Sequence, residues 1–133
     1  SRDKVFEGRK VLLVDDDVRN IFALTSALEH KGAVVVIGRN GREAIEKLNE
    51  VEDIDLVLMD VMMPEMDGFE ATSLIRQDPR WRKLPIIAVT AKAMKDDQER
   101  CLQAGANDYL AKPIDLDRLF SLIRVWLPKM ERI

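Results

Sequence analysis

The sequence predicts one α/β domain in which a doubly wound, five-stranded parallel sheet is covered on both faces by five helices. The chain has 133 residues, of which 47% are hydrophobic. That length suits one compact domain and is too short for two ordinary ones. Five short apolar runs alternate with segments of 3.6-residue periodicity, and such alternation places helices on both faces of a parallel sheet.

The five expected strands are short apolar runs without polar alternation, which is typical of strands buried on both faces of a parallel sheet. Three of them are followed by Asp15, Asp60 and Thr90, the second is closed by Gly38, and the last and weakest runs into Lys112. The runs cover residues 11–14, 34–37, 56–59, 86–89 and 109–111.

The first three expected helices each carry an apolar stripe and a recognisable end. The first has apolar residues at helical spacing and stops at Gly32, and the second and third begin at Asn40 and Asp67. Each of these two capping residues is followed three positions later by a glutamate, which is the pattern of a helix start. The inward-facing residues are Ile21, Leu24 and Leu28, then Ala44, Ile45 and Leu48, then Ala71, Leu74 and Ile75.

The last two helices differ in how clearly the sequence marks them. The fourth is expected from near Lys95 to Ala104, with Gly105 as its stop, and its apolar face is thin. That face holds Met94, Cys101 and Leu102. The fifth begins after Asp115 and is halted by Pro128, and its stripe of Leu116, Leu119, Phe120, Ile123 and Leu127 is the clearest in the chain.

Composition excludes several classes of protein. Charged residues make up 34% of the chain and the formal net charge is −3, which argues against a nucleic-acid binder. A single cysteine, Cys101, rules out an intramolecular disulfide and favours a reducing, cytoplasmic compartment. No apolar run approaches the roughly 18 residues of a membrane span, so no direct membrane contact is expected of this domain. Because the chain begins without methionine, we expect a segment of a longer protein, whose parent chain could be membrane-anchored.

The informative polar residues lie at strand ends, where open α/β sheets bind their ligands. Asp15, Asp16, Asp60, Thr90 and Lys112 are far apart in sequence, yet this fold brings them to one edge of the sheet. Two carboxylates about 4 Å apart repel by about 4 kcal/mol at an effective dielectric of 20, so a pKa must rise or a cation must enter. Hard oxygen ligands suit Mg²⁺, and a carboxylate beside it can act as nucleophile toward a phosphoryl group. The residues therefore predict a magnesium-dependent aspartyl-phosphate site.

Less specific explanations exist for each of these residues. One of the three aspartates at 15–17 can serve as the N-cap of the first helix. Asp60 and Thr90 could be ordinary strand-end residues, and Lys112 could pair with a surface acid for about 0–1 kcal/mol.

Four motifs, in order, resemble the receiver domains of two-component response regulators. They are Val-Asp-Asp at 14–16, Met-Asp-Val-Met-Met-Pro-Glu-Met-Asp-Gly at 59–68, Val-Thr-Ala at 89–91 and Gly-Ala-Asn-Asp-Tyr-Leu-Ala-Lys-Pro at 105–113. The resemblance implies a flavodoxin-like sheet of order 2-1-3-4-5. It also implies an N-terminal extension over 1–9, a receiver domain over 10–128 and a C-terminal tail over 129–133.

Carried over residue by residue, the resemblance assigns roles at the site. Asp60 resembles the phosphoryl acceptor, and Asp15, Asp16, Asp60 and the backbone carbonyl of Met62 resemble the Mg²⁺ ligands. The other implied roles are the switch hydroxyl for Thr90, the phosphoryl-binding lysine for Lys112, the aromatic switch for Tyr109, and a cis Lys112–Pro113 bond.

The resemblance also implies a partner and a parent. A phosphohistidine on a histidine kinase or histidine phosphotransfer protein would donate the phosphoryl group. The segment 17–24 is similar to receivers appended to hybrid histidine kinases, and a stand-alone response regulator is the alternative. The isolated domain would be a phospho-acceptor with self-dephosphorylation rather than a turnover enzyme, whereas a hybrid parent would be a histidine kinase.

Two other classes fit the residues less well. A phosphatase of the haloacid-dehalogenase type needs a second acid two residues after its nucleophile, and Met62 stands there. A nucleotide- or flavin-binding module needs a glycine- or hydroxyl-rich phosphate loop, whereas residues 15–20 contain no glycine.

A docking surface is expected beside the acceptor. Arg19, Asn20 and Ala23 begin the first helix, and Pro113 and Ile114 lie on the opposite rim. A small apolar patch there suits a transient interface, with Arg19 steering toward an acidic partner. The alternative is that Ala23 and Ile114 merely pack inward.

Overall fold

The computed structural model describes residues 4–63, 66–91 and 94–127, and it has the predicted architecture. Five parallel strands form one sheet in the order β2-β1-β3-β4-β5. Strand order therefore reverses beside β1, with β3 as its other neighbour, and this is where α/β sheets place ligands. The strands are β1 Lys10–Val14, β2 Val34–Gly38, β3 Leu56–Asp60, β4 Ile86–Thr90 and β5 Asp108–Ala111.

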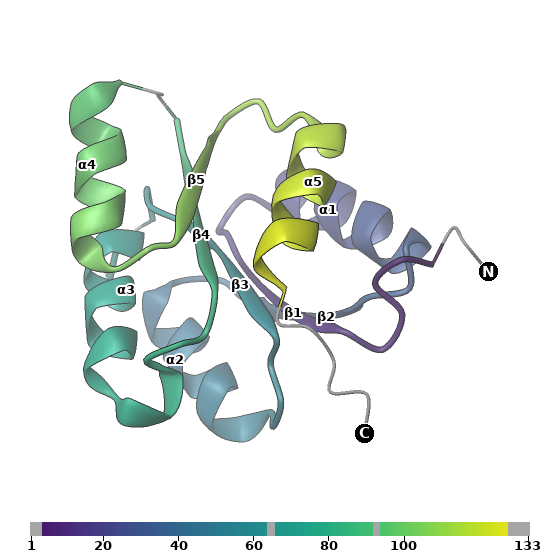
Figure 1. Ribbon diagram of the computed structural model, residues 1–133, viewed down its shortest axis with the longest axis horizontal. Coiled ribbons are helices and arrows are strands. Elements are labelled where there is room, and N and C mark those ends of the chain that lie inside the picture. Colours follow the sequence, from purple (N-terminus) through teal and green to yellow (C-terminus); the bar gives the residue numbers. More distant parts are fainter. Residues whose placement is uncertain (1–3, 64–65, 92–93, 128–133) are drawn as a thin grey trace.

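Five α-helices cover the two faces of the sheet, and Figure 1 shows α2, α3 and α4 on one side with α1 and α5 on the other. Each side has its own apolar core: one buries Ala71 and Ile75 of α3 and Cys101 of α4, and the other buries Leu28 of α1 and Leu119 of α5. The helices are α1 Val18–His30, α2 Gly41–Glu50, α3 Gly68–Gln77, α4 Lys95–Ala104 and α5 Leu116–Trp126, with a 3-10 turn η1 at Pro79–Trp81. None of the described helices has the length and apolarity to cross a membrane.

The predicted helix starts are confirmed by their hydrogen bonds. The Asn40 side chain accepts from the Glu43 amide at 2.9 Å, and Asp67 accepts from the Glu70 amide at 2.9 Å. Asp115 caps α5 by accepting from the amides of Asp117 and Arg118. Each of these caps satisfies amide groups that the helix itself leaves without a partner.

Several residues expected in apolar stripes are exposed instead. The exposed fraction is 39% for Leu74, 49% for Leu102, 63% for Met94 and 42% for Leu116. Leu74 and Leu102 lie at the edge of the buried stripe, because one residue turns a helix by 100°. Met94 and Leu116 are in line with the stripe, but they lie at the N-terminal ends of α4 and α5. The predicted stripes were thus too broad on α3 and α4 and too long at the starts of α4 and α5.

The segment before β1 packs on the domain. Phe6 is 1% exposed and its ring centroid lies 5.9 Å from that of Phe120 on α5. The Phe6 amide donates to the Lys31 carbonyl at 2.9 Å, and Arg9 lies 3.8 Å from Asp55. Phe6 of the expected extension therefore belongs to the core between α1 and α5.

Candidate functional site

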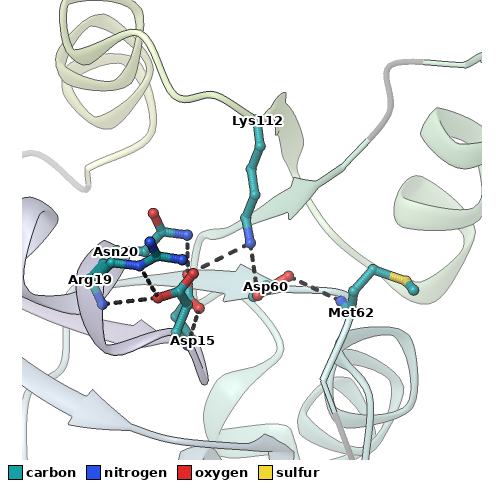
Figure 2. Close-up of polar contacts among 7 residues, drawn as sticks. Asp15, Arg19, Asn20, Asp60, Met62 and Lys112 are labelled. Carbon is teal, nitrogen blue, oxygen red and sulfur yellow. Dashed lines mark hydrogen bonds and ion pairs between the residues drawn. The ribbon is translucent and has the colours of Figure 1, made fainter.

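The predicted site residues meet at the carboxyl edge of the sheet. Asp15 follows the last residue of β1, Asp60 ends β3 and Thr90 ends β4. Lys112 follows β5 directly, and its amide donates to the Thr90 carbonyl at 2.8 Å. Figure 2 shows Asp15, Asp60 and Lys112 directed toward one another from three different segments.

Three carboxylates form the centre of the site. Asp15, Asp16 and Asp60 each offer an oxygen, and these atoms all lie within 4.8 Å of one another. Asp15 and Asp60 are both only 2% exposed, whereas Asp16 is exposed. Like charges packed this closely repel, so the cluster favours a bound cation.

Asp60 is held on both oxygens. Its Oδ1 accepts from the Met62 amide at 3.0 Å, and its Oδ2 accepts from the Lys112 ammonium at 3.1 Å. Burial raises the pKa of Asp60 above its ordinary value, and the charge of Asp15 adds to that rise, against the lowering by Met62 and Lys112. Because burial disfavours its charged form, this carboxyl depends on nearby cations such as Lys112 to stay ionised.

Asp15 is oriented by its own loop and by the first turn of α1. Its Oδ1 accepts from the Asp17 amide at 2.8 Å, and its Oδ2 accepts from the Asn20 side chain at 3.5 Å. Asp17 is the residue that caps α1, accepting from the Arg19 amide at 2.9 Å. Helix capping thus accounts for Asp17 and leaves the other two acids of this run at the site.

Lys112 pairs with buried acids rather than with a surface acid. Its ammonium lies 3.1 Å from Asp60 and 3.9 Å from Asp15, and its side chain is 27% exposed. Burial acts to lower the pKa of Lys112, but its hydrogen bond to Asp60 and the three nearby carboxylates raise that pKa above its ordinary value. The Lys112–Pro113 bond is cis.

Thr90 ends β4 at the edge of the sheet that carries this centre, whereas Tyr109 lies farther from that edge, opposite Ala88. Thr90 is 4% exposed, and Tyr109 is half-buried against the core beneath α2, α3 and α4. The two residues belong to adjacent strands, with Thr90 opposite Ala111. Their switching roles stay predictions.

Sequence reasoning missed one residue that shapes the site. Gly68 begins α3, and a Cβ there would overlap the Asp60 carbonyl oxygen and lie 2.6 Å from the Val61 Cα. Its amide donates to the Val61 carbonyl at 3.2 Å. Gly68 ends the second motif, so the pattern contained it, but the need for glycine is visible only in three dimensions.

A groove of about 540 Å³ opens beside Lys112. Four of the five residues expected at the docking surface line it, whereas Arg19 does not and instead lies 3.7 Å from Asp17. Ala23 is exposed, so the inward packing considered for it does not occur, whereas Ile114 is half-buried and packs against the core of α1 and α5. The full lining is Asn20, Ala23, Leu24, Lys112, Pro113, Ile114 and Leu116.

The donor set fits a hard divalent cation. Carboxylate oxygens on a small, partly open site are the ligands that Mg²⁺ prefers, and the cation would relieve the repulsion among the three acids. The backbone at Met62 is close to Asp60 because its amide bonds to that side chain. Participation of the Met62 carbonyl as a ligand stays a prediction.

Comparison with known proteins adds an independent finding. The family model described as the response regulator receiver domain matches residues 11–124. The chain is 42% identical over 118 residues to the histidine kinase BarA of Escherichia coli K12, covering 89% of this chain but only 13% of that protein. It is 38% identical over 119 residues to the response regulator DivK of Brucella anthropi, covering 90% of this chain and 96% of that protein.

Solved structures agree with the fold. The receiver domain of the sensor histidine kinase PA1611 from Pseudomonas aeruginosa, solved with magnesium in its active-site cleft, superposes with a TM-score of 0.82 at 39% identity, covering 90% of this chain and 97% of that one. A chain of the Saccharomyces cerevisiae complex of the phosphotransfer protein Ypd1 with the receiver domain of Ssk1 gives 0.85 at 32% identity, covering 92% and 91%.

Proposed function

The chain belongs to the response regulator receiver domain family of two-component phosphorelay signalling, and from that membership we propose that Asp60 is its phosphoryl acceptor. The observation that carries the proposal is the environment of Asp60. It is a buried carboxylate bound by a backbone amide and by Lys112, with two further acids within 4.8 Å. A structural aspartate would not need this combination of burial, cation and like charges.

The reaction follows from these groups. An Asp60 oxygen attacks the phosphorus of a partner's phosphohistidine, an O–P bond forms, the N–P bond breaks, and the histidine nitrogen leaves with the bonding electrons. The Lys112 ammonium lies next to Asp60 Oδ2, where its positive charge stabilises the negative charge that develops on the phosphoryl oxygens. The Met62 amide keeps the other oxygen in place.

We propose that Mg²⁺ completes the site, held by Asp15, Asp16, Asp60 and the Met62 carbonyl. When bound, it neutralises phosphoryl charge and keeps the acceptor ionised despite burial. The buried Asp15 is positioned for this by the Asp17 amide and Asn20, and the exposed Asp16 faces solvent, from which the ion enters.

After transfer, the acyl phosphate adds charge at the end of β3. Thr90 and Lys112 are joined through a backbone hydrogen bond, so a shift of either toward the phosphoryl group moves the ends of β4 and β5 together. We propose that Tyr109 turns inward with that shift, so that the surface of α4, β5 and α5 differs between the two states.

The proposed donor is a histidine kinase or a histidine phosphotransfer protein, docked on the groove between α1 and the segment after β5. The α1 side of this groove is formed by Asn20, Ala23 and Leu24. Exposed apolar residues around a polar centre suit a transient interface. Arg19 lies outside the groove lining, and its steering role is proposed for the rim.

We propose a hybrid histidine kinase as the parent chain, with a cytoplasmic receiver. The likeness to BarA supports this proposal, and the likeness to DivK supports the stand-alone alternative. The comparisons contain no support for a haloacid-dehalogenase-type phosphatase, in keeping with Met62 at the position of its second acid.

Small-donor labelling tests the acceptor. Incubation with Mg²⁺ and acetyl phosphate should attach one phosphoryl group, and Asp60→Asn should abolish it. Asp55→Asn is the matched control, because Asp55 lies at the opposite end of β3. Wild-type labelling of the Asp60→Asn protein would refute the proposal.

Docking is tested by separating the two donors. Ala23→Glu and Ile114→Glu should lose transfer from a phosphorylated histidine phosphotransfer protein and keep labelling by acetyl phosphate, since neither residue touches Asp60. Glu46→Gln, on the exposed side of α2, should keep both reactions. Equal loss of both reactions in Ala23→Glu and Ile114→Glu would refute the groove as the docking site.

A further inference from the structure

Arg76, in the last turn of α3, joins four segments that are remote from the phosphorylation site. Its Nε donates to the Gly105 carbonyl at 2.8 Å, and its Nη2 donates to the Asn107 side-chain oxygen at 2.7 Å. Its Nη1 lies within hydrogen-bond distance of three carbonyl oxygens, those of Trp81 at 2.8 Å, Leu84 at 2.6 Å and Arg82 at 3.2 Å. Among the residues that the structure describes, no carboxylate pairs with Arg76.

These acceptors belong to the ends of elements that matter for switching. Gly105 follows the last residue of α4, and Asn107 precedes β5. The Asn107 oxygen also accepts from the Ile86 amide at 2.8 Å, and the Asn107 amide donates to the Ile86 carbonyl at 2.7 Å. The start of β4, the end of α4 and the start of β5 are thus bound to one guanidinium on α3.

Helix α4 is anchored unevenly along its length. Toward its C-terminus Cys101 is buried, its carbonyl accepts from the Ala106 amide at 3.0 Å, and Gly105 ends the helix in the left-handed conformation. At its N-terminus Met94 makes no side-chain cap and is 63% exposed, and Lys95 is exposed as well. A helix held in this way opens first at its N-terminal end.

The loosely held end is the one nearest the site, since α4 follows β4, which ends at Thr90. We propose that Arg76 is the fixed pivot of α4: switching displaces the N-terminal end of the helix while the guanidinium keeps its C-terminal end and the start of β5 in place. The displacement of the N-terminal end of α4 rests on the proposed function. The anchoring of the C-terminal end by Arg76 concerns the unphosphorylated protein alone.

Arg76→Lys and Arg76→Met test the pivot, with Arg82→Met as the matched control because Arg82 is exposed in the neighbouring turn. Lysine keeps the charge but cannot reach acceptors in several directions at once, and methionine keeps only the apolar stem. Each variant is compared with wild type by amide hydrogen exchange and by NMR shifts with and without beryllofluoride, a phosphoryl mimic.

Without beryllofluoride, the amides of residues 101–107 should exchange at least about tenfold faster in Arg76→Met than in the wild type. The increase should be smaller in Arg76→Lys, and Arg82→Met should exchange at the wild-type rate. With beryllofluoride, wild-type shifts should be large at 94–98 and small at 103–107, and in Arg76→Met they should spread through 103–107.

Equal shifts at both ends of α4 in the wild type would overturn the pivot, as would wild-type exchange in Arg76→Met. If Arg76→Met does not fold, the same criteria apply to Arg76→Lys. Failure of beryllofluoride to bind would instead count against the proposed acceptor site, and the exchange arm alone would then decide whether Arg76 anchors α4.

Discussion

Replacing Asp60 by asparagine should stabilise the metal-free protein. Burial disfavours the charged form of Asp60. At the 4.8 Å limit that encloses the three carboxylates, the buried Asp15 adds a repulsion of about 3.5 kcal/mol at an effective dielectric of about 20, whereas the charge of the exposed Asp16 is screened by solvent. The attraction between the Lys112 ammonium and Asp60 at 3.1 Å opposes this repulsion by about 5 kcal/mol at the same dielectric. Repulsion from Asp15 and attraction to Lys112 thus largely cancel, and burial of the charge decides the sign, so Asp60→Asn should be more stable by about 1–3 kcal/mol.

Urea unfolding in EDTA measures this difference, and Glu46→Gln serves as an exposed acid-to-amide control. The difference should also depend on pH. Because the folded-state pKa of Asp60 lies above its ordinary 3.8, the folded protein holds this proton more tightly, and the stability it contributes at low pH is lost as pH rises through the raised pKa. The stability of Asp60→Asn should not fall in that pH range, because asparagine does not titrate there.

Saturating Mg²⁺ should shrink or reverse the difference, because the ion stabilises the folded wild type and binds the variant less tightly. A metal-free Asp60→Asn protein that is less stable than wild type at neutral pH would refute the electrostatic reasoning. Equal stabilisation of both proteins by Mg²⁺ would remove Asp60 from the ligand set.

Three further predictions concern packing. Phe6→Ala should lower the free energy of unfolding by about 3–5 kcal/mol, measured in urea, because it empties a fully buried site; a loss under about 1 kcal/mol would show that residues 4–9 are dispensable. Gly68→Ala should cost more than about 2 kcal/mol and shift the Met62 amide resonance, since the new Cβ overlaps backbone at the end of β3; an unperturbed spectrum would contradict this. Burial raises the pKa of the Cys101 thiol, so iodoacetamide should modify it far more slowly in the native protein than in urea; equal rates would mean that α4 opens freely.

The sequence was sufficient to predict the sheet and the meeting of Asp60 with Lys112, because strand ends are marked by abrupt changes from apolar to polar residues. Parallel strands then bring those ends to one edge whatever the details of packing. Helix starts such as Asn40 were predictable for a similar reason, since a cap and its partner lie within one turn.

Features that depend on how elements pack were not predictable in this way. Leu74 was expected inside because periodicity gives a face but not its width. Phe6 lies in a segment without periodicity, and its burial depends on Phe120 far along the chain. Arg76 binds mainly backbone carbonyls, which every residue carries and which therefore leave no pattern in the sequence.

The position of the acyl phosphate is the most direct test of the account. After labelling with acetyl phosphate and Mg²⁺, borohydride reduction converts a phosphorylated aspartate to homoserine, which peptide mass spectrometry locates. We expect homoserine at position 60 and at no other aspartate, and none when Mg²⁺ is chelated. Homoserine at position 15 or 16, or equal yield without Mg²⁺, would contradict it.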